Sequence, residues 1–162
     1  MRIGHGFDIH GFIGCGPIIL GGVSIPFYKG ISSHSDGDVL IHSLIDSILG
    51  AASLGDIGTY FPDNDLKFRK IDSRILLRKI WKKIEKKYKI GNIDTTIVTD
   101  FPKIINYTDM MKKNISSDLS CSIRDVNIKS TTTENLGFFK KDKGIACEAV
   151  VLLRKIVSFH SS

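Results

Sequence analysis

One segment, residues 36–54, constrains the fold more than any other part of the chain. Apolar side chains dominate it, and three of its polar residues, Asp38, His42 and Asp46, recur every four residues. Residues four apart share one face of a helix, so the segment predicts a core helix with a single polar stripe. Such a stripe either faces solvent or lines a site, where Asp46 could orient His42. Ser35 is placed to cap this helix, with Asp38 three residues later, close to a capping box.

Short segments with the pattern of β-strands lie on both sides of this helix. The predicted strands cover residues 2–10, 18–25 (a strand or a hairpin), 93–99, 126–130 and 145–157. Two further helices are predicted, at residues 72–88 and 106–119. Strands interspersed with helices in 162 residues predict one α+β domain, in which about three helices pack on one side of a mixed β-sheet.

The composition excludes disordered, fibrous and membrane-spanning proteins. Hydrophobic residues make up 42% of the chain and charged residues 25%, as in ordinary globular domains. No apolar run approaches the roughly 20 residues of a spanning helix, and three scattered cysteines are too few for a disulfide framework. The first residues show no secretion signal. We therefore expect a cytoplasmic protein without a membrane partner, with a domain at residues 1–157 and a tail at 158–162 that carries an inert His160.

The net charge of +6 is concentrated in one segment. Residues 67–89 hold eleven basic and two acidic side chains, a net charge of +9, which leaves −3 on the rest of the chain. An amphipathic stripe runs through the same segment, formed by Leu77, Ile80, Trp81, Ile84 and Tyr88. A solvated basic face therefore explains the charge, and no aromatic residues alternate with the lysines as a nucleic-acid stacking surface requires. We expect no nucleic-acid partner.

The strongest chemical signal is a pair of ligand-type residues on the first strand. Asp8 and His10 are two residues apart, so both side chains point to the same face of the strand. With His42 they would supply one oxygen and two nitrogens, and three protein ligands with a fourth position open are typical of catalytic zinc. Other divalent ions, or a plain hydrogen-bonded strand histidine, remain alternatives. His5 has the opposite parity and is interpreted as structural.

Three loops carry groups suited to phosphate or polyol ligands. They are a loop rich in glycine and carboxylates at residues 55–65, a Thr-Thr-Thr-Glu cluster at 131–134, and a Phe-Pro-Lys turn at 101–103. His34 and Ser35 precede the core helix, and a helix N-terminus can bind an anion. Each feature also has a plain structural interpretation, as a turn, a threonine-rich strand end or a helix cap.

Motifs along nearly the whole chain, from residue 1 to about 157, occur in a characteristic order. They are MRIGHGFDIH at the start, HSDGDVLIH at 34–42, GAASLGDIGTYFPDND at 50–65, DSRILLR at 72–78, GNID at 91–94, PK at 102–103, DVNIKSTTTENLGF at 125–138 and GIACEAV at 144–150. This combination closely resembles the 2-C-methyl-D-erythritol 2,4-cyclodiphosphate synthase family of the non-mevalonate isoprenoid pathway.

The resemblance implies an intramolecular phosphoryl transfer. The substrate would be 4-diphosphocytidyl-2-C-methyl-D-erythritol 2-phosphate, whose 2-phosphate attacks the β-phosphorus of the diphosphate. CMP would leave, and 2-C-methyl-D-erythritol 2,4-cyclodiphosphate would remain. Because two phosphate groups repel each other, metal cations are expected. Positioning dominates an intramolecular attack, so no protein nucleophile is needed.

The resemblance also assigns roles to residues. Asp8, His10 and His42 would hold Zn²⁺, and Glu134 would hold Mg²⁺ or Mn²⁺. All of these except His42 would also contact substrate. The expected transition-state stabilisers are His34 and Thr132. His34 would also bind substrate. The residues that match the erythritol-phosphate pocket are Ser35, Asp56, Ile57, Gly58, Phe61, Pro62, Asp63, Asn64 and Asp65. Those that match the CMP pocket are Thr99, Asp100, Phe101, Pro102, Lys103, Ile104, Ile105, Thr131, Thr132 and Thr133.

The resemblance further implies a homotrimer with each active site between two subunits, which fits the apolar last strand. Phe138 and Lys141 complete the expected substrate-binding set. Lys141 stands where the family usually has arginine, and lysine lacks the bidentate geometry of arginine toward phosphate.

Two rival functions can each be distinguished by a simple test. A zinc-dependent phosphohydrolase would release a free monophosphate, and a nucleic-acid-binding module would show salt-dependent retention on DNA.

Overall fold

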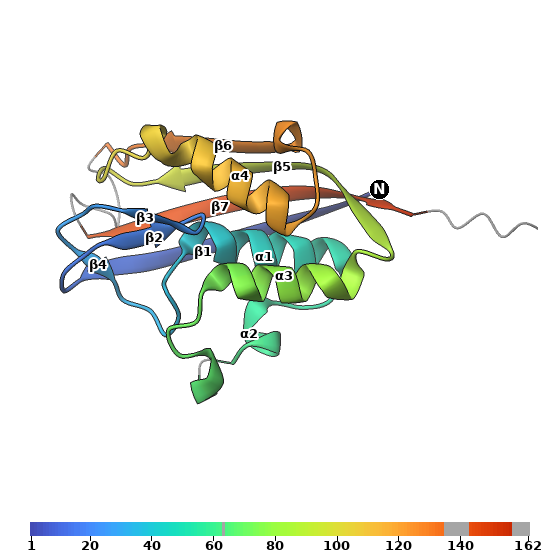
Figure 1. Ribbon diagram of the computed structural model, residues 1–162, viewed down its shortest axis with the longest axis horizontal. Helices are drawn as coiled ribbons and strands as arrows, with labels where there is room; N and C mark the ends of the chain where they lie inside the picture. The colour runs from blue at the N-terminus through green and yellow to red at the C-terminus, as the bar shows by residue number, and fades with distance from the viewer. Residues whose placement is uncertain (63, 135–142, 157–162) are drawn as a thin grey trace, which may run out of the picture.

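A five-stranded mixed sheet is the largest layer of the computed structural model, which describes residues 1–62, 64–134 and 143–156 (Figure 1). In spatial order its strands are β4 (Gly30–Ile31), β1 (Arg2–Ile13), β7 (Gly144–Lys155), β5 (Tyr88–Val98) and β6 (Val126–Thr131). β5 and β6 run parallel, and the other three pairs are antiparallel. A separate hairpin consists of β2 (Ile18–Leu20) and β3 (Val23–Ile25).

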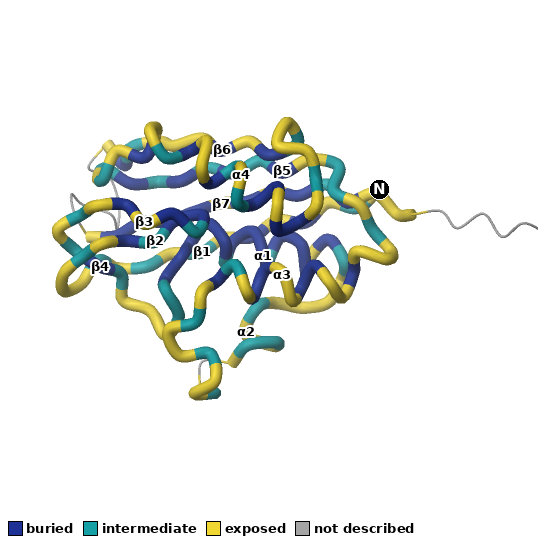
Figure 2. The backbone as a smooth tube through the Cα atoms, in the orientation of Figure 1, coloured by how far each residue is buried: buried dark blue, intermediate teal, exposed yellow. Residues whose placement is uncertain are grey.

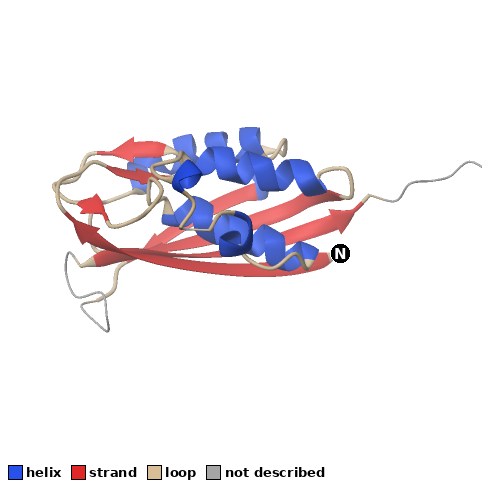
Figure 3. Ribbon diagram, turned by 90° about the horizontal axis from the view of Figure 1, so that it is seen from below, coloured by secondary structure: helices blue, strands red, loops and turns tan. Residues whose placement is uncertain are grey.

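The helices cover one face of this sheet, as Figure 3 shows. They are α1 (Val39–Ala52), the one-turn α2 (Ile57–Tyr60), α3 (Ser73–Ile84) and α4 (Thr108–Asp118). Short 3₁₀ turns complete the structure: η1 (Leu66–Phe68), η2 (Ile105–Tyr107) and η3 (Ile123–Asp125). The predicted α+β class is confirmed, with α2 as a short fourth helix. Within the described residues, no helix is both long and apolar enough to cross a bilayer.

The core helix α1 lies directly against β1, and glycine in β1 permits this approach. A Cβ atom added at Gly6 would lie 2.0 Å from the Ser43 carbonyl oxygen and 2.7 Å from the Ser47 nitrogen. α1 itself is buried along nearly its whole length (Figure 2). The close contact places the polar stripe of α1, with His42, above the part of β1 that carries Asp8.

Gly6→Ala is therefore expected to destabilise the protein. The new methyl group would collide with the α1 backbone, and overpacking of this kind costs about 1–3 kcal/mol or more. For a domain of this size, each 1 kcal/mol lowers the melting temperature by roughly 2–4 °C. Thermal unfolding followed by circular dichroism measures the loss. Gly11→Ala is the matched control in the same strand, because its nearest contact is an ordinary 3.7 Å to the Lys143 carbonyl oxygen. Equal melting temperatures for the two variants would contradict this account.

The start of α1 differs from the prediction because a different residue caps it. The Asp38 carboxylate accepts a hydrogen bond from the Ile41 N–H (3.0 Å), so the helix begins at Val39. The same carboxylate accepts hydrogen bonds from the backbone N–H groups of Gly21 and Gly22 in the β2–β3 turn. The prediction that Ser35 is the N-cap was wrong, and its hydroxyl is left to face the site described below.

The other predicted elements differ mainly at their ends. The helix predicted at 72–88 ends at Ile84, because Tyr88 already begins β5, and the register shift in β5 falls between Ile90 and Asn92. Four residues of its predicted apolar stripe, Leu77, Ile80, Trp81 and Ile84, are buried, whereas Tyr88 lies in β5 and is half-buried. The third predicted helix is divided into η2 and α4, and the last strand covers Gly144–Lys155.

The helix-free face of the sheet is unusually apolar. Ile3, Phe7 and Ile9 of β1 are 73%, 53% and 46% exposed, and Val150 of β7 is 40% exposed. On the same face, His5 Nε2 lies 2.8 Å from a carboxylate oxygen of the neighbouring β7 residue Glu148. An exposed apolar area of this kind is typical of an interaction surface.

Candidate metal and phosphate site

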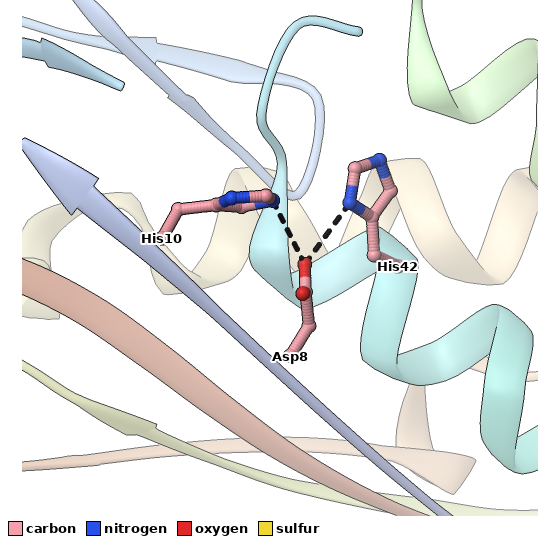
Figure 4. A group of neighbouring side chains, drawn as sticks. All are labelled: Asp8, His10 and His42. Carbon is pink, nitrogen blue, oxygen red and sulfur yellow. Dashed lines mark hydrogen bonds and ion pairs between the residues drawn. The ribbon is translucent and has the colours of Figure 1, made fainter. Parts of the chain in front are cut away.

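Asp8, His10 and His42 converge on one point, as Figure 4 shows. His42 Nδ1 lies 3.0 Å from Asp8 Oδ2, and His10 Nε2 lies 3.2 Å from the same oxygen. All three ligand atoms lie within 4.8 Å of one another. Asp8 and His10 lie on the face of β1 that packs against α1, and His42 lies on the polar stripe of α1 that faces β1. The three side chains therefore meet.

The electrostatics of this cluster favour a bound cation. Burial alone would raise the pKa of Asp8, but the adjacent imidazoles of His10 and His42 outweigh it and hold the pKa well below its usual range. Burial would likewise lower the pKa of His42, yet the Asp8 carboxylate raises it overall. The site thus contains an ionised carboxylate that stabilises positive charge at the centre of the cluster.

The donor set fits a transition-metal dication. In the described part of the chain, His10 Nε2 is buried and has no partner in hydrogen-bonding geometry, although it points toward Asp8. A buried nitrogen of this kind is costly unless a proton donor or a metal uses its lone pair. Two imidazole nitrogens and one carboxylate are typical zinc ligands and leave a coordination position for substrate.

The second nitrogen of His42 also has neighbours. His42 Nε2 lies 2.9 Å from Ser73 Oγ at the start of α3 and 3.1 Å from Ser35 Oγ. Sequence reasoning did not find Ser73, since 31 residues separate it from His42 and no local periodicity connects them. The prediction that Asp46 orients His42 was wrong. Asp46 Oδ1 instead accepts a hydrogen bond from the Ile57 N–H (2.7 Å) and so anchors α2.

A cavity of about 420 Å³ opens beside the metal cluster. The expected pocket residues that line it are His34, Ser35, Ile57, Gly58, Phe61 and Asp65. Phe68, Ile71 and Leu76 also line it, although they were not among the expected pocket residues. Asp56 instead caps α2 by accepting a hydrogen bond from the Thr59 N–H, which also lowers the pKa of Asp56.

A second cavity, of about 430 Å³, adjoins the first and shares His34 with it. Asn64 and Asp65 line it together with Arg69 and Lys70, whose charges suit a phosphate. Among the expected residues of this loop, Pro62 accepts a hydrogen bond from the Asp65 N–H, and Asp63 lies outside the described residues.

A third, smaller hollow of about 170 Å³ lies at the ends of β5 and β6. The expected CMP-pocket residues that line it are Thr99, Pro102, Lys103, Ile104, Thr131 and Thr132. Asp100 accepts hydrogen bonds from the Thr133 backbone and hydroxyl, which supports the wall of this hollow. Phe101 lies under the Lys103 ammonium, and Ile105 is 70% exposed.

Glu134 follows directly on this hollow. Its carboxylate accepts a hydrogen bond from the Thr132 hydroxyl, and its backbone is left-handed, with φ of 51°. Left-handed backbone at a residue with a side chain is uncommon and is concentrated at functional sites. Phe138 and Lys141 lie outside the described residues. Within the described residues of one chain, the metal-site cavity and the threonine hollow share no lining residue.

Comparison with known proteins gives one consistent result. The model of the YgbB family matches residues 1–154. A 2-C-methyl-D-erythritol 2,4-cyclodiphosphate synthase of Klebsiella pneumoniae subsp. pneumoniae is 57% identical over 96% of this chain and 98% of its own length. The synthase of Salmonella paratyphi B is 56% identical with the same coverage.

Solved structures agree with the sequence relatives. The bifunctional IspDF of Campylobacter jejuni superposes with a TM-score of 0.91 at 41% identity, over 96% of this chain and 42% of the larger protein. IspF of Plasmodium falciparum, solved as a CDP complex, superposes with a TM-score of 0.84 at 40% identity, over 96% and 97% of the two chains. By sequence and by fold, the chain belongs to the YgbB family of 2-C-methyl-D-erythritol 2,4-cyclodiphosphate synthases.

Proposed function

We propose that this protein converts 4-diphosphocytidyl-2-C-methyl-D-erythritol 2-phosphate to 2-C-methyl-D-erythritol 2,4-cyclodiphosphate and CMP. The observation that carries the proposal is a near full-length match to curated synthases in a chain whose Asp-His-His cluster opens on a cavity lined by the matching motifs. In the reaction, an oxygen of the 2-phosphate bonds to the β-phosphorus. The bond from that phosphorus to the bridging oxygen breaks, and CMP leaves with the oxygen and its electron pair. No water is consumed.

The chain's own residues position the substrate for this attack. His34 and Ser35 lie on the cavity wall beside the metal cluster, where they would donate to phosphate oxygens. Ile57 and Gly58 line the cavity at the start of α2, which Asp46 anchors by accepting a hydrogen bond from the Ile57 N–H. We assign the erythritol phosphate to this cavity and the cytidine end to the hollow around Thr132. Alignment of the two phosphates in place supplies most of the rate enhancement.

We infer that Asp8, His10 and His42 hold zinc and that Glu134 holds magnesium or manganese. When bound, these cations neutralise the phosphate charge and make the β-phosphorus more electrophilic. The hardness of a carboxylate at Glu134 favours a hard dication, whereas two imidazoles favour zinc.

We propose a homotrimer in which two subunits share each active site. Two observations support it. Ile3, Phe7, Ile9 and Val150 form an exposed apolar area on the helix-free face, which a second copy would cover. Among the described residues of one chain, the metal cavity and the threonine hollow also share no lining residue, as expected if a neighbouring subunit completes each site.

We propose no nucleic-acid or membrane partner. Lys79 and Lys83 of α3 lie over the rings of Phe68 and Tyr60, at 5.7 and 5.2 Å from the ring centres. Part of the basic face therefore stabilises the loop beside the cavity. The cytoplasmic location expected from the sequence stays a prediction.

Phosphorus NMR tests the function directly. The purified protein is incubated with the cytidyl substrate, zinc and magnesium, and the products are followed over time. Formation of CMP together with the cyclic diphosphate is the expected result. Release of a free monophosphate in place of the cyclic product would instead establish the phosphohydrolase.

Glu134→Gln is expected to retain zinc but to require more magnesium. An amide oxygen is a weaker ligand for a hard dication than a carboxylate, so the magnesium concentration for half-maximal activity should rise by at least about tenfold. Activity is titrated against magnesium in the wild type and the variant. Glu85→Gln is the matched control, because Glu85 is an exposed residue at the end of α3. Superimposable curves for Glu134→Gln and wild type would remove Glu134 from the second metal site.

A further inference from the structure

The imidazole of His42 is contacted at both of its nitrogens. Nδ1 faces Asp8 and the metal cluster, and Nε2 faces the hydroxyl of Ser73 at 2.9 Å. Ser73 is fully buried in the first turn of α3, so water cannot replace this contact. The ring is therefore held between β1 and α3, two elements that are distant in sequence.

Asp36 determines the direction of the hydrogen bond at Ser73. The Ser73 hydroxyl donates to Asp36 Oδ1, and the Ser73 N–H donates to Asp36 Oδ2 at 3.0 Å. Oδ1 also accepts from the Asp38 N–H at 3.2 Å. Because the hydroxyl proton of Ser73 goes to a carboxylate, only its lone pairs remain for His42. These lone pairs require a donor at Nε2.

A metal at Nδ1 imposes the matching requirement. A neutral histidine that uses one ring nitrogen as a metal ligand carries its proton on the other, so Nε2 of His42 becomes the donor. We propose that Ser73 and Asp36 are positioning residues for the metal site: Ser73, oriented by Asp36, accepts a hydrogen bond from the Nε2–H of His42 and so holds Nδ1 toward the metal. This inference rests on the proposed metal site and extends it to two residues that do not bind the ion.

Ser35 is the rival acceptor, at 3.1 Å from Nε2. Its hydroxyl lies on the cavity wall, accepts a hydrogen bond from the Gly37 N–H and lies 3.2 Å from Ser33 Oγ. No carboxylate bonded to Ser35 is found among the described contacts, and the side chain is only partly buried. Ser73 is closer to Nε2, more buried and fixed by Asp36, so it is the stronger partner.

Zinc affinity tests the proposal. Loss of a hydrogen-bond partner behind a metal ligand typically costs 10–100-fold in metal affinity. Ser73→Ala should raise the zinc dissociation constant by about that factor, measured by competition with a chromophoric chelator. Ser47→Ala is the matched control, because Ser47 is equally buried but donates to the Leu44 carbonyl oxygen. Ser35→Ala should leave zinc affinity within about twofold of wild type.

A spectroscopic measurement separates positioning from a general loss of packing. In zinc-loaded protein labelled with ¹⁵N-histidine, the Nε2 proton of His42 should be protected from exchange with water. Ser73→Ala should accelerate that exchange, and Ser47→Ala should not. Asp36→Asn should give an intermediate loss of zinc affinity, since the amide can accept at only one atom.

The outcomes are distinct. Wild-type affinity and exchange in Ser73→Ala, with zinc bound normally by the wild type, would overturn the proposal and leave the metal site intact. A loss in Ser35→Ala but not in Ser73→Ala would transfer the role to Ser35 and also overturn it. Equal losses of zinc affinity in Ser73→Ala and Ser47→Ala would show that the effect comes from general packing, and would also overturn the proposal. A wild-type protein that binds no zinc would overturn the metal site together with this inference.

Discussion

His42→Ala is expected to remove tightly bound zinc and nearly all activity without unfolding the protein. His42 supplies one of three protein ligands, and its contacts reach Asp8 on one side and Ser73 on the other. Zinc affinity should fall by more than the roughly 10–100-fold that is lost when a residue hydrogen-bonded to a metal ligand is removed. Turnover at fixed zinc should drop by about 10²–10³-fold or more, as when one preorganised charge-stabilising group is removed.

Metal content and turnover are measured on the same purified sample. Circular dichroism measures whether the helix and strand content of the variant matches that of the wild type. His5→Ala is the matched control for zinc, because His5 is on the same strand but pairs with Glu148 on the opposite face. Full zinc occupancy and normal turnover in His42→Ala would show that His42 is structural and that the metal site is misassigned.

The sequence predicted the metal cluster because each part of it has a local period. Asp8 and His10 share a strand face through alternation, and His42 belongs to a stripe repeating every four residues. The glycines of β1 let the buried helix α1 pack directly on one face of the strand, so the face that carries Asp8 and His10 meets the face of α1 that carries His42. The α+β class followed from the same patterns.

The unpredicted features depend on contacts that no local pattern carries. Ser35 was predicted to cap α1, but Asp38 caps it because its buried carboxylate also accepts hydrogen bonds from the β2–β3 turn. Asp46 was assigned to His42 by spacing, but the chain after α1 folds back and offers the Ile57 N–H to its carboxylate. Ser73 reaches His42 only because α3 packs beside α1. Such pairings are set by tertiary structure, so propensity and spacing leave them open.

The shared active site leads to the second large expected effect, which is the rescue of one inactive variant by another. His42→Ala impairs the metal half of a site and Glu134→Ala the threonine half. In the described residues of one chain these halves line separate hollows. If a cyclic trimer builds each site from two neighbours, a mixed trimer can contain an intact site, although each parent is inactive.

Equal amounts of the two variants are unfolded together and refolded with zinc, and activity is compared with refolded wild type. An intact site needs a Glu134→Ala subunit on its metal side and a His42→Ala subunit on its other side. With random assembly each condition holds half of the time, so about a quarter of wild-type activity should return. Each parent refolded alone is the control and should stay inactive. If one subunit supplied both halves, every site would carry a lesion. A mixture as inactive as its parents, with trimers established by light scattering, would then overturn the shared site while leaving the proposed chemistry in place.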